Sequence, residues 1–374
     1  MRIGVIHPQA GGVRYYRAEL GVAALKRAGV DIELHPNAFE DRIDLWLMKH
    51  VKDYDILHTG YVINHEILKY IVAAREYAEI PFITDIDDDF MNVPAYNIAF
   101  GDYHGGSQGR RITRMMLRMS DAVSVSTPRL QEQLDEDCKL SWVLPNCVYP
   151  PDWQLDKDPQ RHQDDSVRFM FAGNLGRKGD LDTIEDALVH AMEDHPNLRL
   201  FFLGCLPDWA LKWLPSPTDP IRNRVFTIPT MGMARYRATL RWIAPDVIFA
   251  PVAQNEFNRS KSHIKAYDAA MCNAAFLCTD WDTYAAVPAS AAIKVAGNYE
   301  WREAIDALVT DAPMRKRTAR ELYDWVVDEW HIDKHVDKWV SLYERVVKKG
   351  PVRDLADIVR SGGRDGTVGT GEGV

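Results

Sequence analysis

A segment at residues 258–268 (NRSKSHIKAYD) combines side chains that bind phosphate and ribose. It follows an apolar, strand-like run, and we expect a helix that begins near Ser260. On this helix Lys261, Lys265 and Asp268 stand at positions i, i+4 and i+7 and share one face. Seven residues of helix span about 10 Å, the reach from a diphosphate to the ribose of one nucleotide, and first-turn N–H groups favour phosphate. A charged surface helix explains the spacing equally well, so the segment alone leaves both interpretations open.

Two glycine-containing loops offer further contacts for an anionic ligand. The run FMFAGNLGRKGD ends a strand at Gly173 and continues with the cations Arg177 and Lys178. Gly11 and Gly12 follow the first strand-like run, where the lack of a side chain lets backbone N–H groups approach a ligand closely. The pattern is not GxGxxG and no acid ends the second strand-like run, so it does not indicate a dinucleotide site. An exposed basic turn and an ordinary tight turn are the alternative interpretations of the two loops.

The run TDIDDDF places four carboxylates, Asp85, Asp87, Asp88 and Asp89, at the end of another strand-like run. Such carboxylates repel one another and need cations, hydrogen bonds or raised pKa values. A divalent-metal site is one interpretation. A phosphatase-type nucleophile motif is disfavoured, because that motif sits on the first strand of its domain. His58 ends a further strand-like run and is a candidate to line a cleft at the ends of the strands, with a buried structural histidine as the alternative.

These residues follow short apolar runs that alternate with amphipathic stretches along the whole chain. The alternation predicts an α/β fold with two Rossmann-like, doubly wound parallel-sheet domains that face a central cleft, where the carboxyl ends of the strands bind ligands. Strands are expected at 3–7, 31–34, 55–58, 82–85, 122–125, 142–144, 167–172, 198–203, 225–228, 247–250, 275–278 and 292–295. Helices are expected at 14–28, 64–78, 107–119 and 181–191. The expected divisions are an N-terminal domain 1–151, a polar linker 152–165, a C-terminal domain 166–330, a helix 331–349 suited to pack back on the first domain, and a flexible tail 350–374.

Composition limits the class of protein. The 374 residues suit two α/β domains, and the net charge of −9 argues against a general nucleic-acid-binding surface. The five cysteines show no zinc or CxxC spacing, which indicates reduced thiols in a cytosolic protein. No apolar run approaches the roughly 20 residues that span a bilayer, and the first apolar run is too short for a signal peptide. We therefore expect a cytoplasmic protein with no membrane span.

The run from 248 to 280 (IFAPVAQNEFNRSKSHIKAYDAAMCNAAFLCTD) resembles the donor-site region of retaining glycosyltransferases of the GT-B fold, the glycosyl transferases group 1 or family 4-like enzymes. The resemblance implies that a sugar moves from a nucleoside-diphosphate sugar to an acceptor hydroxyl with retention of configuration. It implies that the C-terminal domain binds the nucleotide sugar and the N-terminal domain faces the acceptor. In this family the Lys-Ser pair at Lys261-Ser262 contacts the diphosphate, and an acid at the position of Asp268 holds the ribose. The donor-binding residues implied are Gly11, Gly12, Gly173, Arg177 or Lys178, Asn258, Lys261, Ser262, His263, Lys265 and Asp268, and the catalytic candidates are Asp87, Asp88 and His58.

The match departs from the family pattern at three positions. Asp268 replaces a glutamate, Asn273 replaces a glycine, and Ser260 replaces the first acid of a wider Glu-x7-Glu pattern. The resemblance implies no tightly bound cofactor, and a divalent metal is not expected. The acceptor stays open among a polysaccharide, a lipid-linked sugar, a protein and a modified DNA base. Two alternatives remain: a non-catalytic nucleotide-sugar-binding protein, and a metal-dependent phosphohydrolase centred on the run from Asp85 to Asp89.

Overall fold

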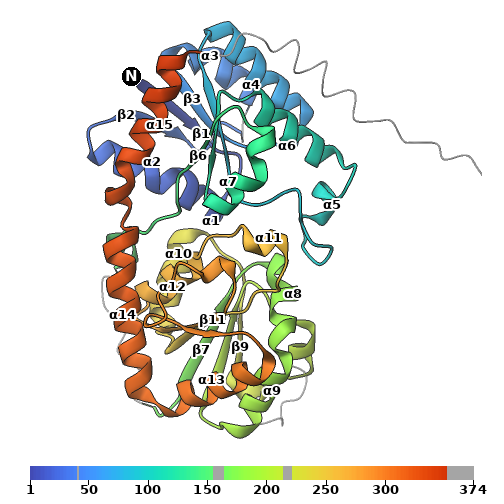
Figure 1. Cartoon of the computed structure of the whole chain (residues 1–374), viewed down its shortest axis with the longest axis vertical. Coiled ribbons are helices and arrows are strands. Elements are labelled where there is room, and N and C mark those ends of the chain that lie inside the picture. Colours follow the sequence, from blue (N-terminus) through green and yellow to red (C-terminus); the bar gives the residue numbers. More distant parts are fainter. Residues whose placement is uncertain (40–41, 155–163, 214–220, 352–374) are drawn as a thin grey trace, which may run out of the picture.

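The computed structural model describes residues 1–39, 42–154, 164–213 and 221–351. These residues form two parallel β-sheets, one in each half of the chain, with helices packed against them (Figure 1). The predicted α/β fold with two doubly wound parallel sheets is therefore confirmed. Residues 155–163 of the predicted linker and 352–374 of the predicted tail lie outside the described residues.

The first sheet positions one wall of the site. Its strands are β1 (Arg2–Ile6), β2 (Asp31–His35), β3 (Ile56–Gly60), β4 (Phe82–Ile86), β5 (Ala122–Val125) and β6 (Ser141–Val143), in the order β2-β1-β3-β4-β5-β6. Its helices are α1 (Gly11–Arg14), α2 (Leu20–Arg27), α3 (Ile43–His50), α4 (His65–Ala78), α5 (Phe100–Tyr103), α6 (Gln108–Met119) and α7 (Pro128–Leu134). β3, β4 and β5 are buried along their whole length, as in parallel strands covered on both faces. Because β1 lies between β2 and β3, the winding reverses there and a crevice opens at the carboxyl ends of β1 and β3.

The second sheet repeats this plan. Its strands are β7 (Val167–Ala172), β8 (Leu198–Leu203), β9 (Val225–Ile228), β10 (Val247–Ala250), β11 (Ala275–Thr279) and β12 (Ile293–Val295), in the order β12-β11-β10-β7-β8-β9. Its helices are α8 (Lys178–Leu181), α9 (Glu185–Asp194), α10 (Met233–Ile243), α11 (Glu256–Arg259), α12 (Ile264–Met271), α13 (Asn298–Thr310) and α14 (Ala312–Trp330). β7 lies between β10 and β8, so the reversal and its crevice fall at the carboxyl ends of β7 and β10.

Helix positions differ from expectation where local hydrogen bonds interrupt the pattern. The expected first helix contains a π-helical segment, Tyr15–Glu19, between α1 and α2. The helix expected at 181–191 is divided, and α9 begins only at Glu185. The helix expected from 331 opens with a 3-10 turn, Ile332–His335. Among the helices of the described ranges, none combines the length and apolar character needed to cross a bilayer.

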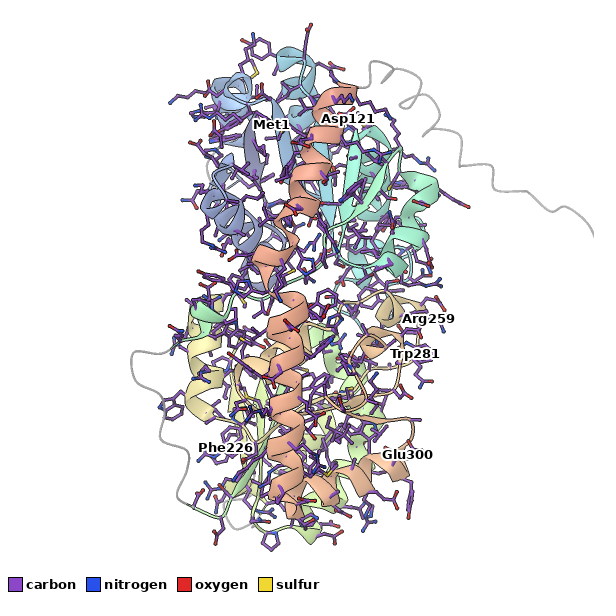
Figure 2. All side chains as sticks on the ribbon, turned by 60° about the vertical axis from the view of Figure 1, so that its left-hand side comes forward. Met1, Asp121, Phe226, Arg259, Trp281 and Glu300 are labelled. Carbon is purple, nitrogen blue, oxygen red and sulfur yellow. The ribbon has the colours of Figure 1, made fainter. Side chains whose placement is uncertain are left out.

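The last helix, α15 (Val336–Lys349), belongs to the core of the first half. Figures 1 and 2 show α14 running beside the second sheet and α15 continuing beside the first. Trp339 and Tyr343 of α15 are buried in a cluster with strands of the first sheet. Gly21 of α2 makes room for this packing, since a Cβ there would lie 2.6 Å from the Trp339 ring. The chain thus crosses between the halves a second time, where Val148 and His331 form a parallel β-bridge.

Candidate functional site

A cavity of about 440 Å³ lies between the two halves, among residues that follow the carboxyl ends of strands. Gly12 follows β1 and Asp87 follows β4 on one side, while Gly173 follows β7 on the other. The predicted residues that line the cavity are Gly12, Asp87, Asp88, Gly173, Arg177, Lys261, Ser262, Lys265 and Asp268. Residues that are far apart in the sequence therefore meet at one site.

The segment 258–268 is not a single helix, which corrects the prediction of a helix from Ser260. α11 ends before Ser260, and α12 begins at Ile264. The carbonyl group of Ser260 accepts a hydrogen bond from the Thr127 hydroxyl at 2.8 Å, so a side chain of the other half uses it at the break between the helices. Lys261 consequently lies in the turn before α12 rather than on its face.

Two residues of this turn face the other half of the chain. Lys261 Nζ lies 2.5 Å from Asp88 Oδ1, and Ser262 Oγ accepts a hydrogen bond of 2.7 Å from the Asn146 side-chain amide. Both contacts join the C-terminal half to the N-terminal half. The turn therefore forms part of the cavity wall and also part of the interface between the halves.

Asp268 lies on α12 with its carboxylate fixed at one oxygen. Oδ2 accepts hydrogen bonds from the Tyr236 hydroxyl at 2.7 Å and from Lys265 Nζ at 2.8 Å. Oδ1 is buried and has no hydrogen-bond partner among the described residues. One carboxylate oxygen is thus oriented by the protein, while the other is buried without a hydrogen-bond partner among the described residues.

The two cations of the loop after β7 have different environments. Arg177 lines the cavity, where its Nε lies 2.9 Å from Asp180 Oδ2 and its Nη1 donates to Asn258 Oδ1 at 3.1 Å. Lys178 pairs with Asp208 and is not among the residues that line the cavity. Of the two candidates that the sequence left open, the structure brings Arg177 to the site.

The acidic run divides into buried and cavity-facing carboxylates. Burial raises the pKa of Asp85, but the guanidinium of Arg17, 2.7 Å away, outweighs it and holds that pKa below its ordinary value. Asp89 accepts hydrogen bonds from the backbone N–H of Met91 and the side chain of Asn92, and so closes a turn. Asp87 and Asp88 line the cavity. Burial and the neighbouring Asp88 raise the pKa of Asp87 to about 7.

His58 lies outside the cavity, so the structure favours its interpretation as a buried structural histidine over that as a catalytic residue. It is 2% exposed, its Nδ1 lies 2.8 Å from the Tyr343 hydroxyl, and its Nε2 lies 3.0 Å from Ser124 Oγ. Burial lowers its pKa to about 4. His58 is a structural histidine because α15 covers the strand that carries it.

Three residues predicted to bind the donor also lie outside the cavity. His263 is buried against Tyr267 and Trp330, and burial lowers its pKa to about 4. Asn258 is 1% exposed and donates to Asp180 Oδ1 at 2.8 Å. Because both Asn258 and Asp180 contact the guanidinium of Arg177, Asn258 helps to position that side chain. Gly11 lines a neighbouring cavity of about 390 Å³ instead.

No family model and no curated protein matches this sequence. Solved structures do match. The Anabaena protein Alr3699/HepE in complex with UDP and glucose is 11% identical, with a TM-score of 0.64 over 92% of this chain and 99% of that one. The catalytic domain of starch synthase IV from Arabidopsis thaliana, bound to ADP and acarbose, is 10% identical, with a TM-score of 0.63 over 93% and 99%. A glycosyltransferase from Rickettsia africae is 14% identical, with a TM-score of 0.58 over 93% and 98%.

The chain has the GT-B fold. In this GT-B chain the cavity also contains residues that were not among the predicted site residues, above all Tyr16, Tyr236 and Tyr284. Tyr16 lies four residues after Gly12, and Tyr284 follows the carboxyl end of β11. Their position after a strand is the sequence feature that could have predicted them as cavity residues. Tyr236 lies on α10, a helix that was not predicted. Within the described residues, no group of three or more His, Cys, Asp or Glu side chains is arranged to hold a metal ion.

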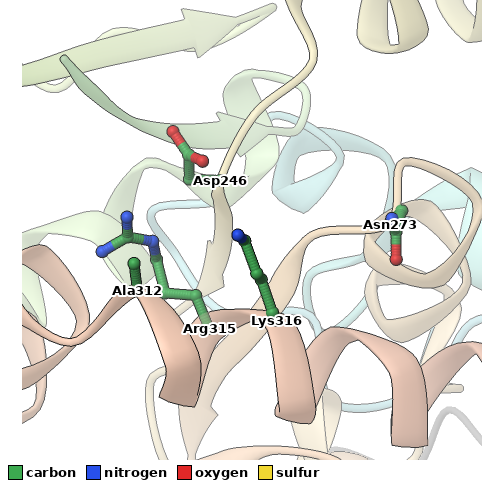
Figure 3. Close-up of a pocket in the computed structure, with 5 residues that line it drawn as sticks. All are labelled: Asp246, Asn273, Ala312, Arg315 and Lys316. Atoms are coloured by element: carbon green, nitrogen blue, oxygen red, sulfur yellow. The ribbon is translucent and has the colours of Figure 1, made fainter. Parts of the chain in front are cut away.

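A smaller hollow of about 60 Å³ lies away from this GT-B cleft. Figure 3 shows Asp246, Asn273, Ala312, Arg315 and Lys316 around it. Asp246 immediately precedes β10, so the hollow lies at the amino end of the second sheet. Ligands of doubly wound sheets bind at the opposite end, and this hollow is therefore not part of the candidate site.

Proposed function

We propose that this chain is a cytoplasmic glycosyltransferase that transfers a sugar from a nucleoside-diphosphate sugar to an acceptor hydroxyl, with retention of the anomeric configuration. The observation that carries the proposal is the set of groups in the cavity. Lys261 and Arg177 supply positive charge, and Asp268, in the second turn of α12, supplies a carboxylate with one free oxygen. These groups suit the diphosphate and the ribose of one nucleotide.

The diphosphate end has the stronger electrostatic support. Lys261 and the guanidinium of Arg177 face the cavity from two different loops of the same half. The side chain of His263 does not cap α12, and the Ala266 amide donates to the His263 carbonyl, so the amides of Ile264 and Lys265 are the ones assigned to phosphate oxygens. Gly12 brings backbone close to the cavity from the other half. A departing diphosphate gains negative charge, and fixed positive groups lower the barrier to its departure.

The nucleoside end lies beside Asp268. Its free Oδ1 can accept a hydrogen bond from a ribose hydroxyl, while Tyr236 and Lys265 hold Oδ2. Solved structures with this fold are described in complex with UDP, with UDP-glucose, or with ADP and acarbose. These complexes support a nucleotide sugar as the ligand that we assign to the cavity of this chain.

The acceptor side is assigned to the N-terminal half, where Asp87 and Asp88 line the cavity. In the proposed reaction the acceptor oxygen forms a bond to the anomeric carbon as the bond from that carbon to the diphosphate oxygen breaks. The acceptor proton passes to the departing phosphate on the same face, so retention needs no nucleophilic side chain. Asp87 and Asp88 would position the acceptor through hydrogen bonds to its hydroxyl groups.

A thermal-shift screen with UDP-, GDP-, ADP- and TDP-sugars tests this function, since a bound donor raises the melting temperature. We expect one donor class to raise it, and we expect Lys261→Ala and Asp268→Ala to weaken binding of that donor by about tenfold or more. Lys178→Ala is the matched control, because that lysine carries the same charge but pairs with Asp208 outside the cavity. Proton NMR of the released sugar or the product then reports the anomeric configuration.

Two outcomes would contradict the proposal. If no nucleoside diphosphate or its sugar raises the melting temperature, the cavity is not a donor site. If a donor binds but is neither hydrolysed nor transferred to any acceptor, the chain is a nucleotide-sugar-binding protein. The phosphohydrolase alternative is weakened because Asp85, the first of the four strand-end acids, is engaged by Arg17.

A further inference from the structure

A chain of hydrogen-bonded side chains connects the two halves of the protein at the cavity. It begins at Asp85, near the carboxyl end of β4, and runs through Arg17 and Asn146 to Ser262. Asp85, Arg17 and Asn146 are at most 3% exposed, whereas Ser262 is partly exposed. Asn146 and Ser262 both line the cavity. The chain therefore leads from an ion pair inside the N-terminal half to a hydroxyl of the C-terminal half that a ligand can reach.

Arg17 fixes the orientation of the Asn146 side-chain amide. A guanidinium carries only hydrogen-bond donors. That of Arg17 donates to the two oxygens of Asp85 at 2.7 and 3.0 Å, to the Leu144 carbonyl at 2.6 Å and to the Asn146 side chain at 3.0 Å. The Asn146 atom that faces Arg17 must therefore be the oxygen Oδ1. The nitrogen Nδ2 consequently points away from Arg17, toward the C-terminal half.

The Asn146 amide in turn fixes the direction of the Ser262 hydroxyl. Nδ2 can only donate, so Ser262 Oγ accepts this hydrogen bond of 2.7 Å and cannot turn its own proton toward Asn146. The proton is left to be donated into the cavity that Ser262 lines. An oxygen of an ionised phosphate suits this position, because it accepts a proton and offers none in return.

The ion pair at the start of the chain gives direction more than stability. Burying the charges of Arg17 and Asp85 costs desolvation, and apolar side chains of similar size often stabilise a fold as well. Asp85 holds the guanidinium at two points, and the guanidinium holds the side chain of Asn146. The carbonyl group of Asn146 is held separately, since it accepts a hydrogen bond of 2.8 Å from the Tyr267 hydroxyl of α12. The side chain and the backbone of Asn146 are thus fixed from different halves of the chain.

We propose that Arg17 and Asn146 are positioning residues, through which the N-terminal half directs the proton of the Ser262 hydroxyl toward a phosphate oxygen of the ligand. This inference rests on the proposed function, which assigns a nucleoside diphosphate to the cavity. Asn146 and Ser262 belong to different halves, so the hydroxyl has its direction only while the halves face each other. Binding of the diphosphate to the C-terminal half therefore depends on a side chain of the N-terminal half that acts through Ser262.

A double-mutant cycle with Asn146→Ala and Ser262→Ala tests the inference. Isothermal titration measures the affinity for UDP, GDP, ADP or TDP, whichever matches the donor that the thermal-shift screen selects. We expect each single change to weaken binding by about threefold to tenfold, the effect of one hydrogen bond. The double variant should bind no more weakly than Ser262→Ala, because Asn146 has no effect once the hydroxyl that it orients is absent.

Asn146→Asp reverses the hydrogen bond to Ser262 and gives a second readout. The carboxylate presents an oxygen where Nδ2 stood, so it accepts the Ser262 proton and withdraws it from the ligand. We expect a larger loss of affinity than in Asn146→Ala. The added negative charge also repels a diphosphate, and the same change in the Ser262→Ala background measures that charge effect alone. The loss should be smaller in that background.

Tyr267→Phe is the matched control, because it removes a hydrogen bond to the backbone of Asn146 and leaves the Asn146 side chain in place. Tyr267 is not among the residues that line the cavity. This variant should have a lower melting temperature and an unchanged affinity for the nucleoside diphosphate. If it lost as much affinity as Asn146→Ala, any weakening of this segment would disturb the site, and the inference would be overturned.

The outcomes separate the inference from the function on which it rests. Additive losses in the cycle, or equal losses from Asn146→Asp in both backgrounds, would overturn the inference while the nucleoside diphosphate still binds and the proposed function stands. If Asn146→Ala does not fold, the comparison of Asn146→Asp in the two backgrounds decides. Failure of every nucleoside diphosphate to bind the unmodified protein would overturn the proposed function, and the inference with it.

Discussion

Lys261 and Asp88 form an ion pair of 2.5 Å between the two halves of the chain. The pair joins the lysine that we assign to the donor diphosphate to a carboxylate of the acceptor side. Asp88 therefore occupies Lys261 before the donor arrives, and an incoming diphosphate must compete with it. The pair also couples donor binding to the acceptor side, because a diphosphate that takes Lys261 releases Asp88.

We expect Asp88→Asn to tighten binding of the nucleoside diphosphate by roughly threefold to tenfold. The change removes the competitor for Lys261 and one negative charge from the cavity wall, and both effects favour an anion. Isothermal titration with the nucleotide chosen by the thermal-shift screen measures it. Glu256→Gln is the control, since Glu256 bridges to Arg129 between the halves but does not line the cavity. Unchanged or weaker binding in Asp88→Asn would show that Asp88 does not oppose the ligand.

A second prediction concerns the loop that carries Tyr96. This residue of the first half lies against Gly179 of α8, where an added Cβ would come within 2.7 Å of the Tyr96 ring. Gly179→Ala should force the halves apart and weaken nucleotide binding by about tenfold, while alanine itself favours the local helix. Small-angle X-ray scattering should show a larger radius of gyration, and titration should show the loss of affinity.

Gly105→Ala is the control for this prediction, because nothing lies within 4 Å of a Cβ at that position. The double variant Gly179→Ala with Tyr96→Ala should lose less affinity than the two single changes added together, since removing the ring relieves the clash. Simple additivity of the two losses would mean that Tyr96 and Gly179 do not act through this contact.

Local patterns predicted the strands of the fold, several of its helices and a set of residues that line the cavity. The strand-like runs predicted β7 to β12 within a residue or two, and β10 and β11 are buried along their whole length, as continuous apolar stretches in a parallel sheet are. Lys261, Lys265 and Asp268 line one cavity, although the helix expected to carry all three begins only at Ile264. Lys261 reaches the cavity from a turn, and no helical periodicity describes that turn.

Contacts between residues far apart in the sequence were not predictable in the same way. The pairing of Asp88 with Lys261 joins residues 173 positions apart, and that of His58 with Tyr343 joins residues 285 positions apart. Such pairs depend on how whole elements pack, which no short pattern in the sequence encodes. His58 was a candidate for the cleft because the strand-like run ends at it, but α15 packs over that strand. The position of a residue along a strand predicts which end of the sheet it lies near, but it does not predict which helix covers that residue.

A third prediction tests the structural role of His58. Tyr343→Phe removes the hydroxyl that lies 2.8 Å from His58 Nδ1 and should lower the free energy of unfolding by about 1 kcal/mol. Nucleotide affinity should not change, because neither residue lines the cavity. Urea denaturation and titration on the same preparation measure the two quantities. If Tyr343→Phe lost nucleotide affinity at unchanged stability, His58 would have a role in nucleotide binding and not a structural one.

The fourth prediction uses the raised pKa of Asp87, which is about 7 in the folded chain against 3.8 as the ordinary value. The folded protein therefore keeps a proton that the unfolded chain releases between about pH 4 and pH 7. Asp87 therefore stabilises the folded protein at low pH, and this contribution to the free energy of unfolding falls as the pH rises from about 4 to about 7. The slope is at most about 1.4 kcal/mol per pH unit, and the contribution is constant above this interval. Asp87→Asn lacks this titration, so its stability relative to the unmodified protein should rise from pH 5 to pH 7 and then stay constant.

His58 and His263, with pKa values lowered to about 4, act in the opposite sense in both proteins, and their contributions cancel in the difference. Urea denaturation of both proteins at half-unit steps of pH measures this difference, and parallel curves from pH 5 to pH 8 would show that Asp87 ionises normally beside Asp88.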